Sequence, residues 1–450
     1  MTKTTSRSMW RVTSASMVGT ALEFYDFALY GTMAALVFGT VFFPTGSPVV
    51  SLMAAFATFG AGFAARPLGA IIFGALGDRF GRKPILSATL LTMGGATFLI
   101  GLLPTYDTIG VFAPILLATL RILQGLGMGG EIGGAQLLTA EHAPSHRRGF
   151  YVGLLQAATL VGALLANGAL LAVSGGFEES AFLAWAWRIP FLFSIVVVIV
   201  GLFIRLRVEE SPVFEHLKTQ EAVVKAPTAT LIRRYPGRLV LCILLFLSSV
   251  PWYINATYVL SYGRDIAGFS NTTMLTITTI VSLLMLPAAP LGGRLSDRFG
   301  RKKVLGISAV GVIVILTFYF PLVSISPVFA FIGMLLLGFT AFIFGGVQGV
   351  MLSEQFGPSV RYSGVSIATA IGSVLGGGLA PFIATAIFAA TGNTLWVAIY
   401  AIGAEALALL GILLLRERRG VDLLLEDPDY IGSTTKQDAT NVPVTAVDSI

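Results

Sequence analysis

The chain has 450 residues, of which 55% are hydrophobic and only 12% are charged, and its mean hydropathy is +0.84. Because a soluble domain has about 25% charged residues, this composition excludes an ordinary water-soluble protein and predicts a membrane protein with many spans. The formal net charge of +6 does not indicate nucleic-acid binding, since the basic residues lie in short connections between apolar segments. The single cysteine, Cys242, excludes an intrachain disulfide and a metal site built from cysteines, and we expect neither a metal nor a cofactor.

Apolar segments long enough to cross a bilayer as helices, about 20 residues each, follow one another along the chain. Twelve such segments predict an all-α membrane protein with twelve transmembrane helices in two six-helix pseudo-repeats. We expect the spans at 16–42, 51–76, 85–104, 110–140, 149–174, 184–206, 238–262, 272–295, 304–322, 328–353, 362–390 and 394–415. The predicted domains are an N-terminal half (1–206), a cytoplasmic central linker (207–237), a C-terminal half (238–416) and a polar, disordered cytoplasmic tail (417–450).

Charge distinguishes the alternate connections between these spans. One set is rich in basic residues, for example Arg82 and Arg147, whereas the other contains Glu178 and has Arg264 as its main basic residue. Since cytoplasmic connections are enriched in Lys and Arg, we expect a multi-pass protein of the cell membrane with both termini in the cytoplasm. The first apolar segment is long and has no small-residue cleavage site, so we expect a retained helix and not a signal peptide.

The six-residue sequence Asp-Arg-Phe-Gly-Arg-Lys occurs twice, at 78–83 and at 297–302. Each copy has a Gly four residues before its Asp and lies between two apolar segments. A second pattern is also repeated: Glu, Pro, Arg and Gly follow one another at nearly the same spacing after the fourth span, from Glu141 to Gly149, and after the tenth, from Glu354 to Gly364. Duplication of a six-span unit is typical of transporters built from two halves around a central site. The sequence therefore predicts a transporter, and not an enzyme or a receptor.

We expect the duplicated turn to act as a gate, because a charge cluster that bridges helices can hold one face of a transporter closed. The alternative is that its basic residues only determine topology. The recurrence of Asp, with Gly before it, in both copies favours the gate. The predicted gating residues are Asp78, Arg79, Arg82, Asp297, Arg298 and Arg301, together with Glu141 and Arg147 after the fourth span and Glu354 and Arg361 after the tenth.

Ionisable residues within the spans are candidates for function, because a charge in the bilayer costs at least about 2.5–3.5 kcal/mol on insertion scales. Glu23, Asp26 and Tyr30 share one face of the first span. A carboxylate in a low-dielectric environment binds a proton more tightly, so we expect Asp26, the deeper of the two acids, to carry the proton, with Glu23 or Glu131 in support. The alternative is that either Glu23 or Asp26 is an ordinary residue at the cytoplasmic end of the helix, without a role in transport.

Arg66 lies well inside the second span, where its guanidinium group could hold a carboxylate with two hydrogen bonds. The alternative, an internal salt bridge to Asp26 or Glu23, overlaps with this role. Polar residues of other spans could contact the same substrate, although those of the fifth span could equally bond helix to helix. The candidate substrate-binding residues are Arg66, Arg121, Gln124, Tyr30, Gln156 and Asn255.

Several of these motifs resemble a known family. The sequences Gly74-x-x-x-Asp78-Arg79-x-Gly81-Arg82-Lys83 and Gly293-x-x-x-Asp297-Arg298-x-Gly300-Arg301-Lys302 resemble the cytoplasmic signature of the major facilitator superfamily, and Arg121-x-x-Gln124-Gly125 resembles the fourth-helix motif of its proton-coupled members. Glu23–Phe27, Arg66–Ala70, Gly129–Glu131 and Trp187–Phe191 resemble the metabolite:proton symporter family. Carriers of that kind move carboxylates such as shikimate, 2-oxoglutarate and citrate, or zwitterions such as proline and betaine.

The motifs and the resemblance together predict a proton-coupled secondary transporter that imports a small organic acid, a mono- or dicarboxylate, by alternating access. No nucleotide-binding motif is present, so an ion gradient or the substrate's own gradient would drive transport. The expected partners are the organic anion, a proton and the lipid bilayer, without nucleic acid and with the protein as a monomer. The alternatives are a zwitterion symporter of the betaine or proline type and, with weaker support, a drug-export antiporter.

Overall fold

The computed structural model describes residues 6–80, 82–129, 134–207, 227–357, 360–421 and 423, and these residues form helices without any strand. The first half of the chain contains α1 (Ser6–Met33), α2 (Gly39–Phe42), α3 (Pro48–Phe80), α4 (Arg82–Leu102), α5 (Tyr106–Ile109), α6 (Phe112–Gly129), α7 (Gly134–His142), α8 (Arg148–Gly176), α9 (Glu179–Ala181) and α10 (Arg188–Arg207). The second half contains α12 (Pro227–Arg234), α13 (Pro236–Leu245), α14 (Ser249–Tyr253), α15 (Val259–Asp265), α16 (Asn271–Met285), α17 (Ala288–Phe299), α18 (Arg301–Leu316), α19 (Tyr319–Ile325), α20 (Pro327–Ser353), α21 (Arg361–Ser373), α22 (Ala380–Thr391) and α23 (Thr394–Leu414).

The predicted twelve-helix membrane fold is confirmed. Within the described residues, ten helical segments are long and apolar enough to cross a membrane, and α18 with α19, bent by 53°, forms an eleventh. The apolar stretch Ser87–Leu102 of α4 stands in the remaining predicted position. Many large apolar side chains on these helices are exposed, for example Ile71 at 69% and Ile307 at 65%, as lipid-facing residues of a membrane protein are.

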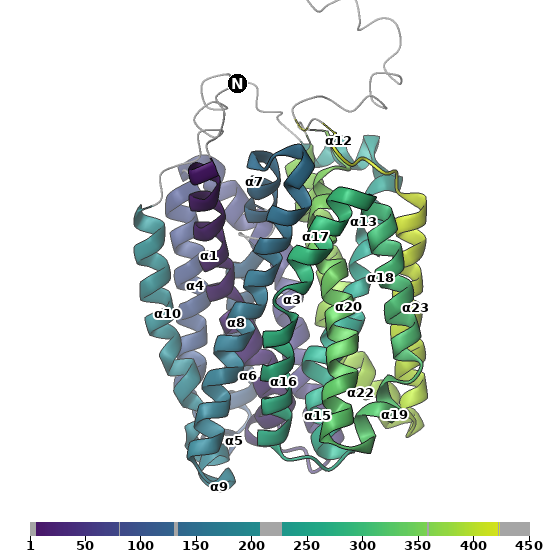
Figure 1. Ribbon diagram of the computed structural model, residues 1–450. Coiled ribbons are helices and arrows are strands. Elements are labelled where there is room, and N and C mark those ends of the chain that lie inside the picture. The colour runs from purple at the N-terminus through teal and green to yellow at the C-terminus, as the bar shows by residue number, and fades with distance from the viewer. Residues whose placement is uncertain are drawn as a thin grey trace, which may run out of the picture.

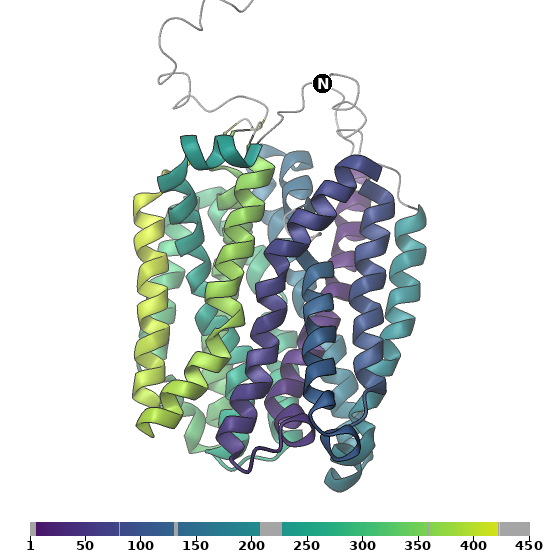
Figure 2. The same cartoon turned by 180° about the vertical axis from the view of Figure 1, so that it is seen from behind.

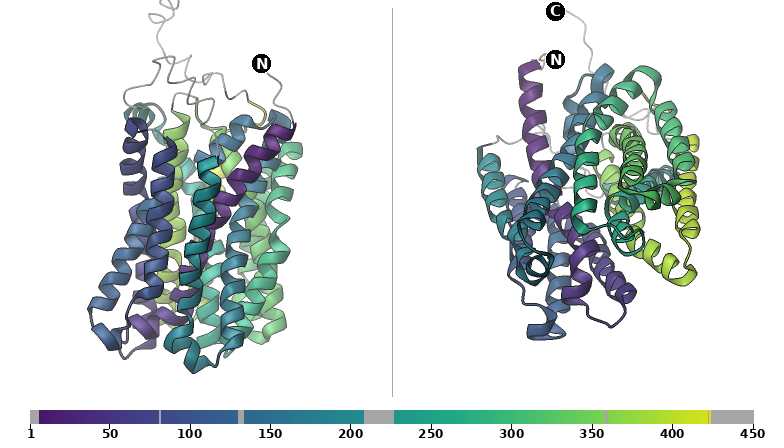
Figure 3. Two further views of the ribbon diagram at one scale, coloured as in Figure 1. Left: turned by 90° about the vertical axis from the view of Figure 1, so that its left-hand side faces the viewer. Right: turned by 60° about the horizontal axis from the view of Figure 1, so that its bottom comes forward.

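The helices of the two halves form two groups that lie side by side (Figures 1 and 2). Figure 3 shows the same two groups from the side and with the bottom turned forward. The beginning of α1 and the end of α23 lie at the same end of the bundle, which we call the terminal end; the opposite one is the far end. The groups meet where α8 packs against α16 and α17, and where α3 packs against α22.

Two glycines allow the halves to approach closely at the terminal end. A Cβ atom on Gly149 of α8 would lie 2.5 Å from the carbonyl oxygen of Gly293 in α17, and a Cβ atom on Gly293 would lie 2.0 Å from the carbonyl oxygen of Gly149. Contacts this short with backbone atoms cannot be relieved by rotating a side chain. The Gly of the repeated motif in the second half is therefore required by helix packing.

Substitution of Gly149 by Ala is expected to separate α8 from α17 and to lower transport strongly. Overpacking of this kind costs about 1–3 kcal/mol, and the cost falls on the state in which the terminal ends of the halves touch. Substrate uptake into proteoliposomes measures the effect. Gly168→Ala in the same helix is the matched control, because no neighbouring atom lies within 4 Å of the Cβ atom that it would gain; equal activity of the two variants would contradict the packing role.

Each half also contains a π-helical segment in its first span. These segments are Ala34–Phe38, which follows α1, and Ile254–Tyr258, which follows α14. Their separation nearly equals that of the two Asp-Arg-Phe-Gly-Arg-Lys copies. π-helical turns concentrate at functional sites, and the second of these segments contains Asn255, a predicted site residue.

Candidate functional site

A cavity of about 250 Å³ lies between the two halves, and both halves line it. Among the described residues, its charged lining residues are Arg66 and Glu23. The rest of the wall is neutral and combines amide and hydroxyl groups with aromatic rings. The polar members include Thr32, Gln136, Gln156, Asn167, Ser249, Asn255, Thr278, Ser282 and Gln348, and the aromatic ones include Phe24, Phe27, Phe59, Phe246, Trp252, Tyr253, Phe342 and Phe344.

Arg66 is a buried cation in the wall of this cavity. Its guanidinium carbon lies 3.9 Å from the ring centroid of Phe63 and 5.0 Å from that of Phe27. Its Nη2 donates a 3.5 Å hydrogen bond to the sulfur of Met128, and its buried Nε has no hydrogen-bond partner within the described residues. Glu23, which faces the same cavity, interacts with it electrostatically. The surroundings hold the charge by cation–π contacts and leave hydrogen-bond donors for a ligand.

Arg121 lies behind the cavity wall. It is 1% exposed, and its guanidinium carbon lies 4.3 Å from the ring centroid of Tyr30 and 5.1 Å from that of Phe59. Its Nη1 donates a 2.9 Å hydrogen bond to Gln124, whose Nε2 donates to Thr97 at 2.6 Å. These predicted substrate-binding residues are thus brought together, but as a layer that supports the wall.

Asp26 belongs to this supporting layer as well. The residue is 2% exposed, its carboxyl group neighbours Thr97 and interacts electrostatically with Arg121, and its Oδ1 has no hydrogen-bond partner within the described residues. Tyr30 also lies outside the cavity lining and hydrogen-bonds Thr58 at 2.7 Å. The third predicted proton-coupling residue, Glu131, lies outside the described residues. The two described acids of the first span therefore occupy different positions, Glu23 in the cavity and Asp26 behind it.

Two of the three predicted amides, Gln156 and Asn255, line the cavity. Gln156 of α8 accepts a 3.5 Å hydrogen bond from Gln136. Asn255 donates to the carbonyl of Met334 at 3.2 Å and accepts from the Tyr319 hydroxyl at 2.7 Å, so it connects its helix to two others. Sequence reasoning did not select Gln136 as a site residue, because a single neutral residue near the end of the predicted span 110–140 carries no pattern.

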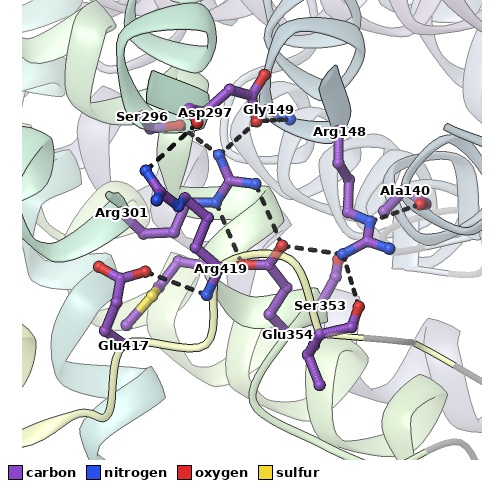
Figure 4. A network of polar contacts seen from close by, with 12 residues as sticks. Ala140, Arg148, Gly149, Ser296, Asp297, Arg301, Ser353, Glu354, Glu417 and Arg419 are labelled. Carbon is purple, nitrogen blue, oxygen red and sulfur yellow. Dashed lines mark hydrogen bonds and ion pairs between the residues drawn. The ribbon is translucent and has the colours of Figure 1, made fainter. Parts of the chain in front are cut away.

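A network of buried charges joins the halves at the terminal end (Figure 4). Glu354, the residue after α20, accepts two hydrogen bonds of 3.2 Å from Arg301 and one of 3.0 Å from Arg148 of the other half. Arg301 also pairs with Asp297 at 2.6 Å. Asp297 in turn accepts 2.9 Å hydrogen bonds from the backbone N–H groups of Gly149 and Phe150. A carboxylate of one half thus caps the first turn of α8 in the other, where the helix dipole favours negative charge.

Some of the predicted gating residues form ion pairs at the terminal end and others do not. Asp297, Arg301 and Glu354 are in the network, and Glu141 pairs with Arg361 across the halves at 3.5 Å. Glu354 pairs with Arg148 and not with the predicted Arg147. Arg148 stands seven residues after Glu141, and Arg361 stands seven residues after Glu354, so the two halves match in this spacing. Arg147 and Arg298 are exposed. Arg147 ends the turn 145–147, and Arg148, the first residue of α8, is the one that points inward. The side chains of Asp78, Arg79 and Arg82 lie outside the described part of the chain.

The halves also touch at the far end. Arg264 of α15 donates a 2.7 Å hydrogen bond to the carbonyl of Leu36, which lies in the π-helical segment of the first span. Arg264 also forms an ion pair with Asp265 at 2.6 Å. The cavity therefore lies between two levels at which the halves are in direct contact.

Comparison with known proteins agrees with this architecture. Residues 12–226 match the family of sugar (and other) transporters, and residues 241–438 match the major facilitator superfamily. The chain is 40% identical to the inner membrane metabolite transport protein YhjE of Escherichia coli K12, over 91% of this chain and 94% of that protein. This chain belongs to the major facilitator superfamily. As a major facilitator, it is a multi-pass membrane transporter of small molecules and not an enzyme.

Other members of the superfamily are also similar to this major facilitator. The shikimate transporter of Escherichia coli K12 is 40% identical, with 90% of this chain and 94% of that protein covered. The proline/betaine transporter of the same organism is 36% identical, with 86% and 79% covered. A solved structure, the partially occluded inward open conformation of the xylose transporter XylE from E. coli, superimposes with a TM-score of 0.70 at 22% identity, covering 93% of this chain and all of that one.

Proposed function

We propose that this major facilitator is a proton-coupled symporter that imports a small organic acid by alternating access. The observation that carries the proposal is Arg66, a buried cation at the cavity wall with hydrogen-bond donors left for a ligand. Guanidinium groups bind carboxylates with two parallel hydrogen bonds. The similarity to shikimate and metabolite transporters supports an organic acid as substrate.

The positions of the two acids suggest how a proton enters the cycle. An ionised Glu23 competes with the substrate carboxylate for Arg66, because both acids would face the same cation in the same cavity. Asp26 has an unpaired buried oxygen, and leaving a carboxylate in that situation is costly unless it binds a proton. We propose that Asp26 holds the transported proton, and that neutralisation of Glu23 frees Arg66 for the substrate.

We also propose that the terminal end faces the cytoplasm. Exposed basic residues are concentrated there, among them Arg147, Arg298, Arg416 and Arg419, as the positive-inside rule requires of cytoplasmic connections. In this orientation the network around Glu354 closes the cytoplasmic side, and the contact of Arg264 with Leu36 closes the outer side. The predicted domains at 1–206, 207–237, 238–416 and 417–450 remain our proposal for how the chain is divided.

A zwitterion of the betaine or proline type is the second candidate substrate. Trp252, Tyr253 and Phe342 line the cavity, and the rings of Trp252 and Phe342 lie 5.0 Å apart. Such rings attract quaternary ammonium groups by cation–π interaction. The similarity to a proline/betaine transporter is consistent with this alternative, in which Arg66 would hold the carboxylate end of the zwitterion.

Substitution of Asp26 by Asn is expected to separate substrate movement from proton movement. The amide keeps the size of the side chain but does not take up and release a proton, so uptake driven by a pH gradient should be lost while exchange of substrate across the membrane continues. Both are measured in proteoliposomes that contain the purified protein. If Asp26→Asn accumulates substrate in response to a pH gradient as the natural protein does, the assignment of the proton to Asp26 is wrong.

A further inference from the structure

We infer that the cavity accepts a substrate with one negative charge and discriminates against dicarboxylates. This inference rests on the proposed function and narrows its substrate class. Among the described residues that line the cavity, Arg66 is the only cation and Glu23 the only anion. Neutralising one acid therefore leaves one positive charge to be matched by the substrate.

The second buried arginine does not add to this charge. Arg121 is outside the cavity lining and packs against Phe59, a lining residue; its Nη1 donates to Gln124, and its buried Nε has no hydrogen-bond partner within the described residues. Its charge interacts with that of Asp26. Arg66 and Glu23 thus face the cavity, whereas Arg121 and Asp26 lie behind its wall, so a proton on Asp26 changes the charge behind the wall and leaves the charge of the lining unchanged.

A second carboxylate on the substrate would face neutral groups. The second half's part of the wall is formed by α16, α20, α21 and the segment around Asn255, and its polar groups are neutral: hydroxyl groups such as that of Ser282, and the amide of Gln348, whose Nε2 donates to the carbonyl of Leu245. Neutral donors compensate a buried anion only partly, whereas an unpaired charge keeps most of its desolvation penalty. We expect a dicarboxylate to bind at least about tenfold more weakly than a monocarboxylate of the same shape.

Succinate and succinamate test this inference, because they differ in charge and hardly in size, and malate with its monoamide provides a second such pair. Binding to the full-length purified protein is measured by ligand-induced thermal stabilisation. We expect succinamate and the monoamide of malate to stabilise the natural protein at lower concentrations than succinate and malate do. We also expect Gln348→Lys, which adds a cation to the second half's part of the wall, to reverse this order, with Gln348→Met as the neutral control.

The outcomes separate the inference from the proposed function. Equal or tighter binding of the dicarboxylates to the natural protein would overturn the single-charge inference and leave the proposed transport of organic acids intact. Failure of Gln348→Lys to favour dicarboxylates would likewise count against it. Absence of stabilisation by any carboxylate, with stabilisation by glycine betaine or proline, would instead overturn the proposed function.

A second observation concerns the segment that follows α23, Leu415–Val421, which we call the C-terminal strap. Arg419 donates a 2.7 Å hydrogen bond to the carbonyl of Arg298, and Glu417 accepts one of 2.9 Å from the backbone N–H of Lys302. The carbonyl of Val421 accepts a 3.2 Å hydrogen bond from Arg148 of the first half. We infer that the strap stabilises the closed terminal end, since it contacts the repeated motif in one half and a gate arginine in the other.

Spin-label distances across the terminal end test the strap. Labels at the exposed positions Ser145 and Phe299 report the separation of the halves after the buried Cys242 is replaced by Ala. Replacing Glu417 and Arg419 together by Gln removes the charged groups that make the surface hydrogen bonds of the strap and is expected to raise the ratio of open to closed protein about threefold or more. Arg233→Gln, an exposed position of α12, is the control. A distance distribution identical to that of the control would overturn the role of the strap.

Discussion

Replacement of Arg66 by Ala is expected to abolish carboxylate uptake while the protein remains folded. The guanidinium group is the cavity's described cation, and removing one partner of a buried, hydrogen-bonded charge pair costs about 2–5 kcal/mol, which corresponds to a loss of affinity of about 30-fold or more. Arg66→Lys keeps the charge without the planar fork and should retain only part of the activity. Uptake into proteoliposomes and thermal stability of the same preparations are the measurements.

The matched control for Arg66 is Met128→Leu. The sulfur of Met128 accepts the hydrogen bond from Nη2 of Arg66, so this variant changes the neighbour and keeps the guanidinium group in the cavity. Uptake by Met128→Leu should stay within a small factor of that of the natural protein. Carboxylate uptake by Arg66→Ala at the natural level would contradict the substrate site proposed for this cavity.

Replacement of Glu354 by Ala is expected to open the terminal end. Glu354 is the shared partner of Arg148 and Arg301, and its side chain and that of Arg301 are fully buried. Breaking a buried pair by removing one partner costs about 3–5 kcal/mol, because the other charge stays buried without compensation. Arg301 keeps its bonds to Asp297 and Ser296, so we expect a cost near the lower limit, about 3 kcal/mol, in the closed state.

Cysteine labelling from the terminal side measures this opening. A single cysteine at Gln348 in the cavity, in a Cys242→Ala background, should react faster with a membrane-impermeant reagent when Glu354 is replaced by Ala. Arg147→Ala is the matched control, since Arg147 is charged, adjacent to the network and exposed. If the two variants label at the same rate, the charge network does not hold the terminal end closed.

The fold could be predicted because its signals are long. Apolar segments of span length indicate the number and order of the helices, and the copy of Asp-Arg-Phe-Gly-Arg-Lys at 297–302 lies in a charge network between the halves. Which arginine pairs with which carboxylate was harder to predict. Arg147 and Arg148 are adjacent in sequence, and only the beginning of α8 after the turn 145–147 turns Arg148 toward Glu354.

The residues that line the cavity could be predicted only in part. Helical periodicity indicates which residues share one face of a helix, but it does not indicate which neighbouring helix or cavity that face contacts. Glu23 and Asp26 are three residues apart, which corresponds to about 60° around a helix. That angle is enough to place Glu23 in the cavity and Asp26 behind the wall. Arg121 and Tyr30 were both predicted as substrate-binding residues, and the structure places both outside the cavity lining, where Arg121 packs against Phe27 and Phe59, whose sequence pattern is that of any apolar span.

Buried Glu405 shows a further limit of pattern reading. It is 1% exposed in α23, and both carboxyl oxygens have no hydrogen-bond partner within the described residues. Nothing in the sequence or the structure explains its presence in the last span. Its position outside the cavity lining separates it from the transport site proposed here.

The central claim, symport of an organic acid with a proton, is tested most directly in proteoliposomes that contain the purified protein and a pH-sensitive dye. A pH gradient, acidic outside, is imposed while uptake of radiolabelled shikimate, lactate, succinate, glycine betaine and proline is followed together with luminal pH. We expect a carboxylate to accumulate above its external concentration and the lumen to acidify with it. Uptake that is indifferent to the pH gradient, or accumulation of only the zwitterions, would contradict the central claim.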